Sequence, residues 1–348
     1  MAFTLKRLSE IFAVSGCEDE VRKFIETEIA DKCDKIRIDS MGNIIALKRG
    51  KSSCKKIMLG TNIDEAGFIV SGITDDGYIK MKAVGAIDPR TLISKRVVIG
   101  KSHIKGVIGM KAIHVQEKSE RENAVKLDAL YIDIGENSKK KACKRVELGD
   151  YITFDTEYGE FGDSVKGKAL DRMGVHCLIK AMEEIPAYDT YFVFSTQREI
   201  PCLIKGRGMR TASFKVRPDY VLIVDTPDSG DVYKNSRPYA KLGGGAVIEY
   251  MDRTNISNTM FINAVKNLAV SKGIAVQDKM SSTGETIAGA AAQASDAAVT
   301  GVVGIPCRYS HTPVSIMNKK DIEAAAELCA AFVRESDVII DGITEKID

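Results

Sequence analysis

The chain has 348 residues, of which 44% are hydrophobic and 28% are charged. These fractions are ordinary for a globular protein, and the length suits either two domains or one large domain with an insertion. The 50 basic and 48 acidic residues leave a formal charge of +2, which gives no bulk attraction to nucleic acid or to an anionic membrane. We therefore expect no nucleic acid and no membrane among its partners.

The cysteines are scattered along the chain, and none belongs to a C-x-x-C pair. The N-terminal residues predict an amphipathic helix with acidic side chains rather than a signal sequence. No apolar run approaches the length of a membrane span. We therefore predict a cytoplasmic protein whose cysteines are reduced and serve mostly in packing. The eight are Cys17, Cys33, Cys54, Cys143, Cys177, Cys202, Cys307 and Cys329.

The first 67 residues have the pattern of an α/β unit. Apolar residues at helical spacing predict helices over 3–13 and 18–31. Two alternating segments, 36–39 and 43–47, predict a hairpin, and 55–60 predicts a buried strand.

Residues 68–160 differ in having many short strands separated by glycine turns, which predicts a small β-barrel or sandwich. From 161 to 348 helix and strand alternate again, which predicts a mostly parallel central sheet covered by helices. We interpret 1–67 and 161–348 as one α/β domain, interrupted by the β domain at 68–160. Within the second part we expect helices over 172–184, 259–272, 287–298 and 319–335, and strands over 191–196, 220–225 and 301–305.

Candidate metal ligands follow several of the predicted strands. In open α/β sheets, functional groups collect at the carboxyl ends of the strands. Carboxylates and imidazole at separate strand ends are the ligands expected of a pair of catalytic zinc ions. Asp225 is the strongest single candidate, because an acid that ends an apolar run seldom lacks a partner. The candidates are Asn62 with Asp64, Asp171, Glu199, Asp225 and His311.

A series of short motifs, in constant order and spacing, covers nearly the whole chain: 14–22, 39–43, 63–68, 84–89, 106–109, 131–135, 167–171, 207–212 and 305–314. Together they resemble the tetrahedral (TET-type) metalloaminopeptidases, which include glutamyl and deblocking aminopeptidases and relatives formerly labelled endoglucanases. The resemblance implies a zinc-peptidase-like domain that acts on peptides or small amides. It also implies that the inserted β domain dimerises, and that the dimers assemble into a homo-oligomeric dodecamer.

The resemblance also assigns roles to individual residues. The family binds one metal ion through positions that correspond to Asp171, Glu199 and His311. For the second ion it uses Asp171, Asp225 and a histidine at the position of Asn62. The bridging position is ambiguous, because the segment after Lys168 is one residue shorter than the family's and places either Asp171 or Leu170 there.

Two further positions concern the chemistry. Asp64 corresponds to the aspartate that orients the missing histidine, and Arg198 stands where the family has its general base. A guanidinium stays protonated and cannot take a proton from water. We expect Arg198 to lie among the carboxylates and to replace part of the charge of a cation. In the alternative, Arg198 points to solvent and Glu65 or Glu285 acts as the base.

We therefore predict a metalloaminopeptidase scaffold with weak or absent peptidase activity. It would bind one divalent ion (zinc, cobalt or manganese), with the second metal site lost. Two alternatives are an active single-metal hydrolase of another amide, such as an acylated amino acid, and a non-catalytic structural subunit of a mixed particle. Glycoside hydrolysis would need two suitably spaced carboxylic acids, and no motif favours it.

Overall fold

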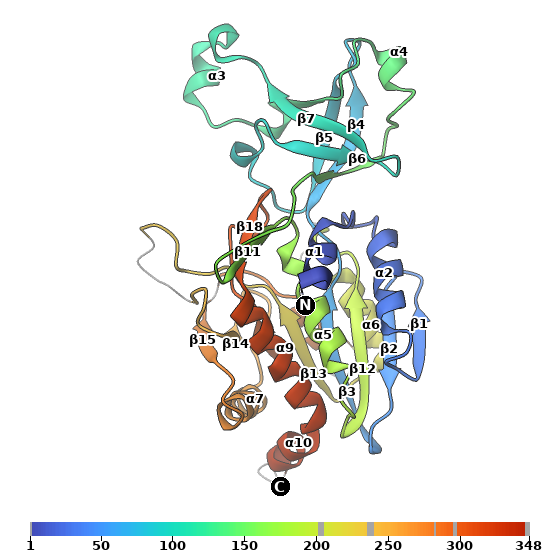
Figure 1. Cartoon of the computed structure of the whole chain (residues 1–348), viewed down its shortest axis with the longest axis vertical. Coiled ribbons are helices and arrows are strands. Elements are labelled where there is room, and N and C mark those ends of the chain that lie inside the picture. The colour runs from blue at the N-terminus through green and yellow to red at the C-terminus, as the bar shows by residue number, and fades with distance from the viewer. Residues whose placement is uncertain (1, 201–204, 235–239, 282, 295–297, 345–348) are drawn as a thin grey trace.

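The computed structural model describes residues 2–200, 205–234, 240–281, 283–294 and 298–344. They form an α/β unit with a smaller β-barrel at one end of its long axis (Figure 1). Among these residues, no helix combines the length and the apolar character needed to cross a membrane.

An eight-stranded sheet lies at the centre of the α/β unit. Its middle strands β12, β3, β13 and β16 are parallel to one another, whereas β2 and β14 are antiparallel to β12 and β16. The strands in order across the sheet are β1 (Lys35–Ile38), β2 (Ile44–Lys48), β12 (Tyr188–Ser195), β3 (Ser52–Asn62), β13 (Tyr220–Asp225), β16 (Val299–Gly304), β14 (Ala246–Met251) and β15 (Val276–Met280).

Helices cover both faces of this sheet, which explains why β13 is buried along its whole length and apolar up to its last residue, Asp225 (Figure 1). Successive side chains of β13 point to opposite faces, so Leu222 packs in one hydrophobic cluster and Ile223 in the other. The first cluster includes residues of α2 (Asp19–Ile29), α5 (Gly174–Ala181), α7 (Thr259–Ser271), α9 (Lys319–Arg334) and α10 (Ser336–Thr344). The second includes residues of α6 (Arg207–Val216) and α8 (Ala288–Ala292).

The β-barrel is closed and has its own core, which includes Phe68, Ile108 and Ile132. Its strands in order are β4 (Gly67–Ile73), β5 (Ile79–Val84), β8 (Leu130–Asp133), β7 (Ile104–Met110), β6 (Arg96–Ile99) and β9 (Tyr151–Phe154). A four-stranded sheet lies between the barrel and the helices, formed by β10 (Gly159–Phe161), β11 (Ser164–Gly167), β18 (Ser315–Asn318) and β17 (Cys307–Arg308). The remaining helices are α1 (Ala2–Glu10), α3 (Lys118–Glu122) and α4 (Lys139–Ala142).

The predicted α/β class, with parallel strands at the centre of the sheet and an inserted barrel, is confirmed. The helix expected over 287–298 is shorter and ends at Ala292. Helix α6 and the last two strands across the sheet, β14 and β15, were not predicted. The face that α6 buries carries Met209, Ala212 and Val216 at helical spacing, but this apolar period is short and is interrupted by the buried residues Gly208 and Ser213.

The close approach of α5 to the sheet should make Gly174 sensitive to substitution. A Cβ atom there would lie 2.2 Å from Oγ1 of Thr61 and 3.1 Å from the carbonyl oxygen of Val224. We expect Gly174→Ala to lower the free energy of unfolding by about 1–3 kcal/mol, measured by urea denaturation. Gly342→Ala is the control: an added Cβ meets open space in the described structure, and alanine favours a helix by about 0.5–1 kcal/mol. Equal effects of the two changes would contradict this account.

Candidate metal site and active site

Two buried carboxylates fix the turn that follows β12. Gln197 has φ = 56°, in the left-handed region, which costs a non-glycine residue about 1 kcal/mol. Glu18 accepts a hydrogen bond from the backbone nitrogen of Gln197 at 3.1 Å. Asp64 accepts one from the backbone nitrogen of Glu199 at 3.0 Å. These bonds offset the strain and determine where the side chains of residues 198 and 199 project.

The guanidinium of Arg198 lies inside the acidic pocket and does not point to solvent. Arg198 is 3% exposed. It donates to Oε1 of Glu199 through Nη1 and to Oδ1 of Asp225 through Nη2, the latter at 3.0 Å. Burial alone would lower the pKa of Arg198, but the surrounding carboxylates, Asp225 foremost, raise it. This side chain is therefore a permanent cation.

Asp225 already accepts three hydrogen bonds from groups of the chain. Its Oδ1 accepts from Arg198 and, at 2.7 Å, from the backbone nitrogen of Thr226. Its Oδ2 accepts from the backbone nitrogen of Ile287 at 3.0 Å. The expectation that an acid at the end of an apolar strand needs a partner is met here by a guanidinium and two backbone amides.

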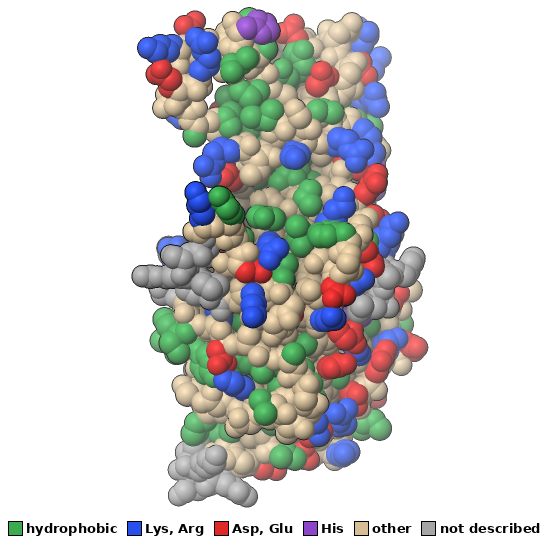
Figure 2. Space-filling view, turned by 60° about the vertical axis from the view of Figure 1, so that its left-hand side comes forward, with side chains coloured by type: hydrophobic (Ala, Val, Ile, Leu, Met, Phe, Trp, Pro, Cys, Tyr) green, Lys and Arg blue, Asp and Glu red, His purple; other side chains and the backbone are tan. Residues whose placement is uncertain are grey.

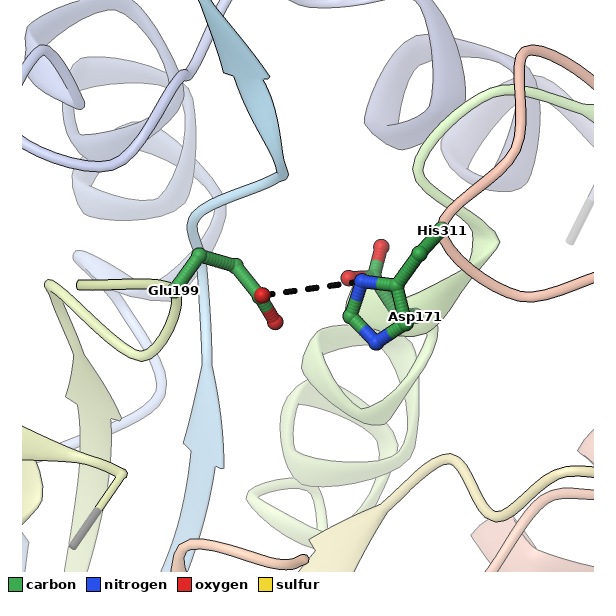
Figure 3. A group of neighbouring side chains, drawn as sticks. All are labelled: Asp171, Glu199 and His311. Carbon is green, nitrogen blue, oxygen red and sulfur yellow. Dashed lines mark ion pairs between the residues drawn. The ribbon is translucent and has the colours of Figure 1, made fainter. Parts of the chain in front are cut away.

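Asp171, Glu199 and His311 converge from three separate segments (Figure 3). One ligand atom from each lies within 4.8 Å of the others. Oε2 of Glu199 and Nδ1 of His311 are 3.5 Å apart. Both atoms are buried, and neither has a hydrogen-bond partner among the described residues. Buried polar atoms are normally satisfied, so this pair indicates a missing cation or proton between them.

The charges of these groups suit a metal ion. Burial lowers the pKa of His311, so its ring is neutral near pH 7 and offers a lone pair. Burial alone would raise the pKa of Glu199, but nearby charges, Arg198 foremost, keep it below its usual value and the carboxylate ionised. Burial raises the pKa of Asp171 to about 7. Two carboxylates and one imidazole form a common ligand set for zinc, so the residues present fit one divalent ion.

A second ion does not fit the described side chains. Asn62 is fully buried, and its Nδ2 donates to the carbonyl oxygen of Asp64 at 3.2 Å. Its Oδ1 has no partner among the described residues, but a neutral amide oxygen binds zinc poorly compared with imidazole. The other acid expected at this position, Asp225, already pairs with Arg198.

The shortened segment delivers Asp171 to the cluster, whereas Leu170 is fully buried in the hydrophobic core. Ala169 adopts φ = 50°, in the left-handed region, and a 3-10 turn follows over Leu170–Arg172. Sequence alone could not decide between Asp171 and Leu170 at this position, because an alanine gives no signal for a left-handed conformation.

The two acids considered as replacement bases have other partners. Glu65 is buried, and both of its carboxylate oxygens accept from Nζ of Lys168, at 2.9 and 3.2 Å. Glu285 forms an ion pair with Arg253 at 3.4 Å.

Sequence reasoning missed two residues near the site. Glu18 resembles an ordinary acid at the start of a helix, but it is 5% exposed and accepts hydrogen bonds from the backbone nitrogens of Gly16 and Gln197. Burial, followed by repulsion from Asp64, raises the pKa of Glu18 to about 7. Lys205 lies 3.8 Å from Oε2 of Glu199 and adds a second cation beside that carboxylate. Only the three-dimensional positions identify these residues.

The profile of the M42 glutamyl aminopeptidase family matches residues 42–328 of this chain. The chain belongs to this family. A protein of Acetivibrio thermocellus is 35% identical over 327 residues, covering 93% of this chain and 96% of its own. These matches confirm the predicted resemblance to the TET-type aminopeptidases. M42 aminopeptidases depend on divalent metal ions.

Solved structures of similar proteins agree with the fold. An aminopeptidase of the archaeon Desulfurococcus kamchatkensis has a TM-score of 0.90 at 31% identity, covering 96% of this chain and 94% of its own. The TET1 peptidase of Pyrococcus horikoshii, which can assemble into a tetrahedron or a large octahedral shell, has a TM-score of 0.84 at 28% identity, covering 96% and 99%.

Removing the positive charge of Arg198 should destabilise the metal-free protein. We expect Arg198→Met to lower the free energy of unfolding by about 3–5 kcal/mol, because Asp225 and Glu199 would remain buried without their cation. Urea denaturation in the presence of EDTA measures this change. Arg253→Met, which removes the exposed partner of Glu285, is the control and should change little. A loss no larger than that of the control would show that the buried pairs contribute nothing.

Proposed function

We propose that this chain is an M42 aminopeptidase scaffold that binds one divalent ion and hydrolyses peptides weakly or not at all. The ion, zinc, cobalt or manganese, would be held by Asp171, Glu199 and His311. The observation that carries the proposal is the buried contact of Arg198 with Glu199 and Asp225. A permanent cation there fills the place of a second metal ion and of the general base.

The chemistry left to such a site is limited. A bound divalent ion would polarise an amide carbonyl and lower the pKa of a water molecule. Deprotonating that water also requires a base within hydrogen-bond reach, and Arg198 cannot accept a proton. Glu65 is neutralised by Lys168, and Glu285 pairs with Arg253, so neither of the two acids considered as replacement bases is free. Loss of a general base costs about 10²–10⁴ in rate.

A second candidate function is hydrolysis of an acylated amino acid or a related amide. Arg198 and Lys205 place two cations beside Glu199. The α-ammonium group of a free peptide N-terminus would be repelled by them, whereas an acylated nitrogen carries no charge. This arrangement favours N-blocked over free amino-terminal substrates.

A structural role in an assembly is compatible with both candidates. We propose homo-oligomers in which the inserted domain, 68–160, forms dimers that associate further into a dodecamer. A structure of a TET1 peptidase that is 28% identical to this chain is a dodecamer. In this chain, hydrophobic side chains gather at the barrel end of the face drawn in Figure 2. Barrel residues Ile113 and Val115 are 70% and 54% exposed, as expected of a contact surface. As a non-catalytic subunit, the chain would join active relatives in a mixed particle.

Metal binding should be stoichiometric at one ion per chain. After chelation and dialysis, calorimetric titration with Zn²⁺ should give a single site, because the described residues contain one group of three acidic and histidine side chains with ligand atoms within 4.8 Å of one another. His311→Ala and Glu199→Gln should abolish binding. Asn62→Ala is the matched control and should bind within about twofold of the unmodified chain, since an amide is a poor ligand. Two ions per chain, or binding that survives His311→Ala, would refute the single-site proposal.

Restoring the family's residues should restore peptide hydrolysis. We expect the double substitution Asn62→His with Arg198→Glu to raise kcat/KM for aminoacyl p-nitroanilides by about 10²–10⁴, because it returns the base and the lost ligand. Arg198→Gln, which removes the cation without adding a base, is the control. If the unmodified chain hydrolyses these substrates fast, and if chelators abolish this hydrolysis, the proposal of impaired activity is overturned. If acyl-amino substrates alone are hydrolysed, the second candidate function holds.

A further inference from the structure

We propose that the buried ion pair of Glu65 and Lys168 positions Asp171 and couples this residue to the barrel. The inference rests on the proposed metal site, in which Asp171 is a ligand. Neither Lys168 nor Glu65 belongs to the group of potential ligands around His311. Both would act on the site only through Asp171, as positioning residues.

Lys168 is held from several directions. It is 2% exposed, and its Nζ donates to both oxygens of Glu65 at 2.9 and 3.2 Å. It also donates to Oγ1 of Thr153 at 2.7 Å and to the carbonyl oxygen of Ile11 at 3.2 Å. An ammonium with this number of close acceptors has little freedom, so the backbone that carries it is fixed as well.

Arg172 holds the other end of the same turn. It is fully buried, and its Nη2 donates to the carbonyl oxygen of Ile11 at 2.8 Å. The same nitrogen lies 3.6 Å from Oε1 of Glu65. Lys168 and Arg172 therefore bind the same carboxylate and the same carbonyl group from opposite sides of Asp171 in the sequence.

The turn between these anchors needs such support. Ala169 is in the left-handed region, at φ = 50°, and only the short 3-10 turn Leu170–Arg172 follows before α5. A left-handed alanine costs about 1–2 kcal/mol, so the turn would relax if its ends were free. Relaxation would move Asp171 away from Glu199 and His311. Anchoring both ends to Glu65 opposes this movement.

Thr153 extends the same network into the barrel, because it belongs to strand β9. Strand β9 pairs with β4 and β6, so the hydroxyl that Lys168 contacts moves with the barrel wall. Glu65 lies two residues before β4 and also accepts from the backbone nitrogen of Ala13 at 3.1 Å. The charge cluster thus connects the barrel, the N-terminal segment and the turn that carries Asp171.

Stability alone is a weak explanation for this cluster. Burying an ion pair costs desolvation that its attraction often fails to repay, and apolar replacements of such pairs are frequently tolerated. Atoms Nε and Nη1 of Arg172 also have no hydrogen-bond partner among the described residues, which adds to the cost. A fixed geometry for a ligand-bearing turn accounts for the retention of charged groups here.

The test measures Co²⁺ binding and thermal stability of the full chain. Apo-protein is titrated with Co²⁺ and followed by its visible absorption, while circular dichroism gives the Tm. We expect Lys168→Met to weaken Co²⁺ binding by about 10–100-fold, as loss of a ligand's support usually does. Thr153→Val, which removes one acceptor at nearly constant shape, should weaken Co²⁺ binding by about 3–10-fold. Thr153→Ser keeps the hydroxyl group and should bind Co²⁺ like the unmodified chain. Thr153→Val also keeps the test usable if Lys168→Met does not fold.

The control is Lys279→Met, which breaks another buried ion pair, that of Lys279 with Glu249 on β15 and β14. It should lower the Tm while leaving Co²⁺ affinity unchanged. If Lys168→Met and Thr153→Val lower the Tm like this control but bind Co²⁺ within twofold of the unmodified chain, the cluster is merely structural and the inference fails.

A crystal structure of the Thr153→Val or Lys168→Met variant separates this inference from the proposed function. If the unmodified chain binds no Co²⁺ at all, the proposed metal site is wrong. In that case, the position of Asp171 in the variant decides whether the ion pair positions this residue. We expect the carboxylate of Asp171 in the variant to lie outside the 4.8 Å group that it forms with Glu199 and His311 in the unmodified chain. An unmoved Asp171 would overturn it.

Discussion

The site is organised around a guanidinium buried among carboxylates. Asp64, Asp171, Glu199 and Asp225 are all buried near one another, and like charges at such distances repel unless a cation or protons intervene. Arg198 supplies one fixed charge and joins the end of β13, through Asp225, to the turn after β12, through Glu199. Its charge is insufficient for all four acids. Burial, with repulsion from Glu199, still raises the pKa of Asp64 to about 6. This uncompensated charge supports the proposal that the pocket binds one more cation beside His311.

The buried charges around Lys168 lie beside those around Arg198, and the adjacent residues Asp64 and Glu65 belong one to each group. Asp64 holds the turn that carries Glu199, whereas its neighbour Glu65 holds the turn that carries Asp171 through Lys168. Neighbouring residues in an extended segment point to opposite sides, which is how adjacent acids reach different partners. The segment leads directly into β4 of the barrel. The position of the barrel and the geometry of the site are thus connected through a few buried bonds.

The sequence predicted those features that depend on periodicity or on residue type. Alternation of helix and strand indicated the α/β sheet, short strands between glycines indicated the barrel, and the acid at the end of β13 indicated a buried partner. No local pattern encodes the contact between residues 198 and 225, but the family resemblance led us to expect Arg198 among these carboxylates, and the structure confirms it. Glu18 could not be distinguished from a helix-start acid, and the choice between Leu170 and Asp171 depended on the backbone conformation of Ala169. Helix α6 was missed because its apolar period, Met209, Ala212 and Val216, is short and mixed with Gly208 and Ser213.

A guanidinium and a metal ion are equivalent in charge balance but not in chemistry. Both can neutralise buried carboxylates, and the planar arrangement of N–H donors suits two acids at once. A metal ion also offers open coordination positions where a carbonyl oxygen or a water molecule can bind and become polarised. Arg198 has only donors, and its two terminal nitrogens are already engaged by Glu199 and Asp225. In the proposed one-ion site, Arg198 would help to neutralise the pocket without offering an open coordination position, and activation of the substrate would depend on the single remaining ion.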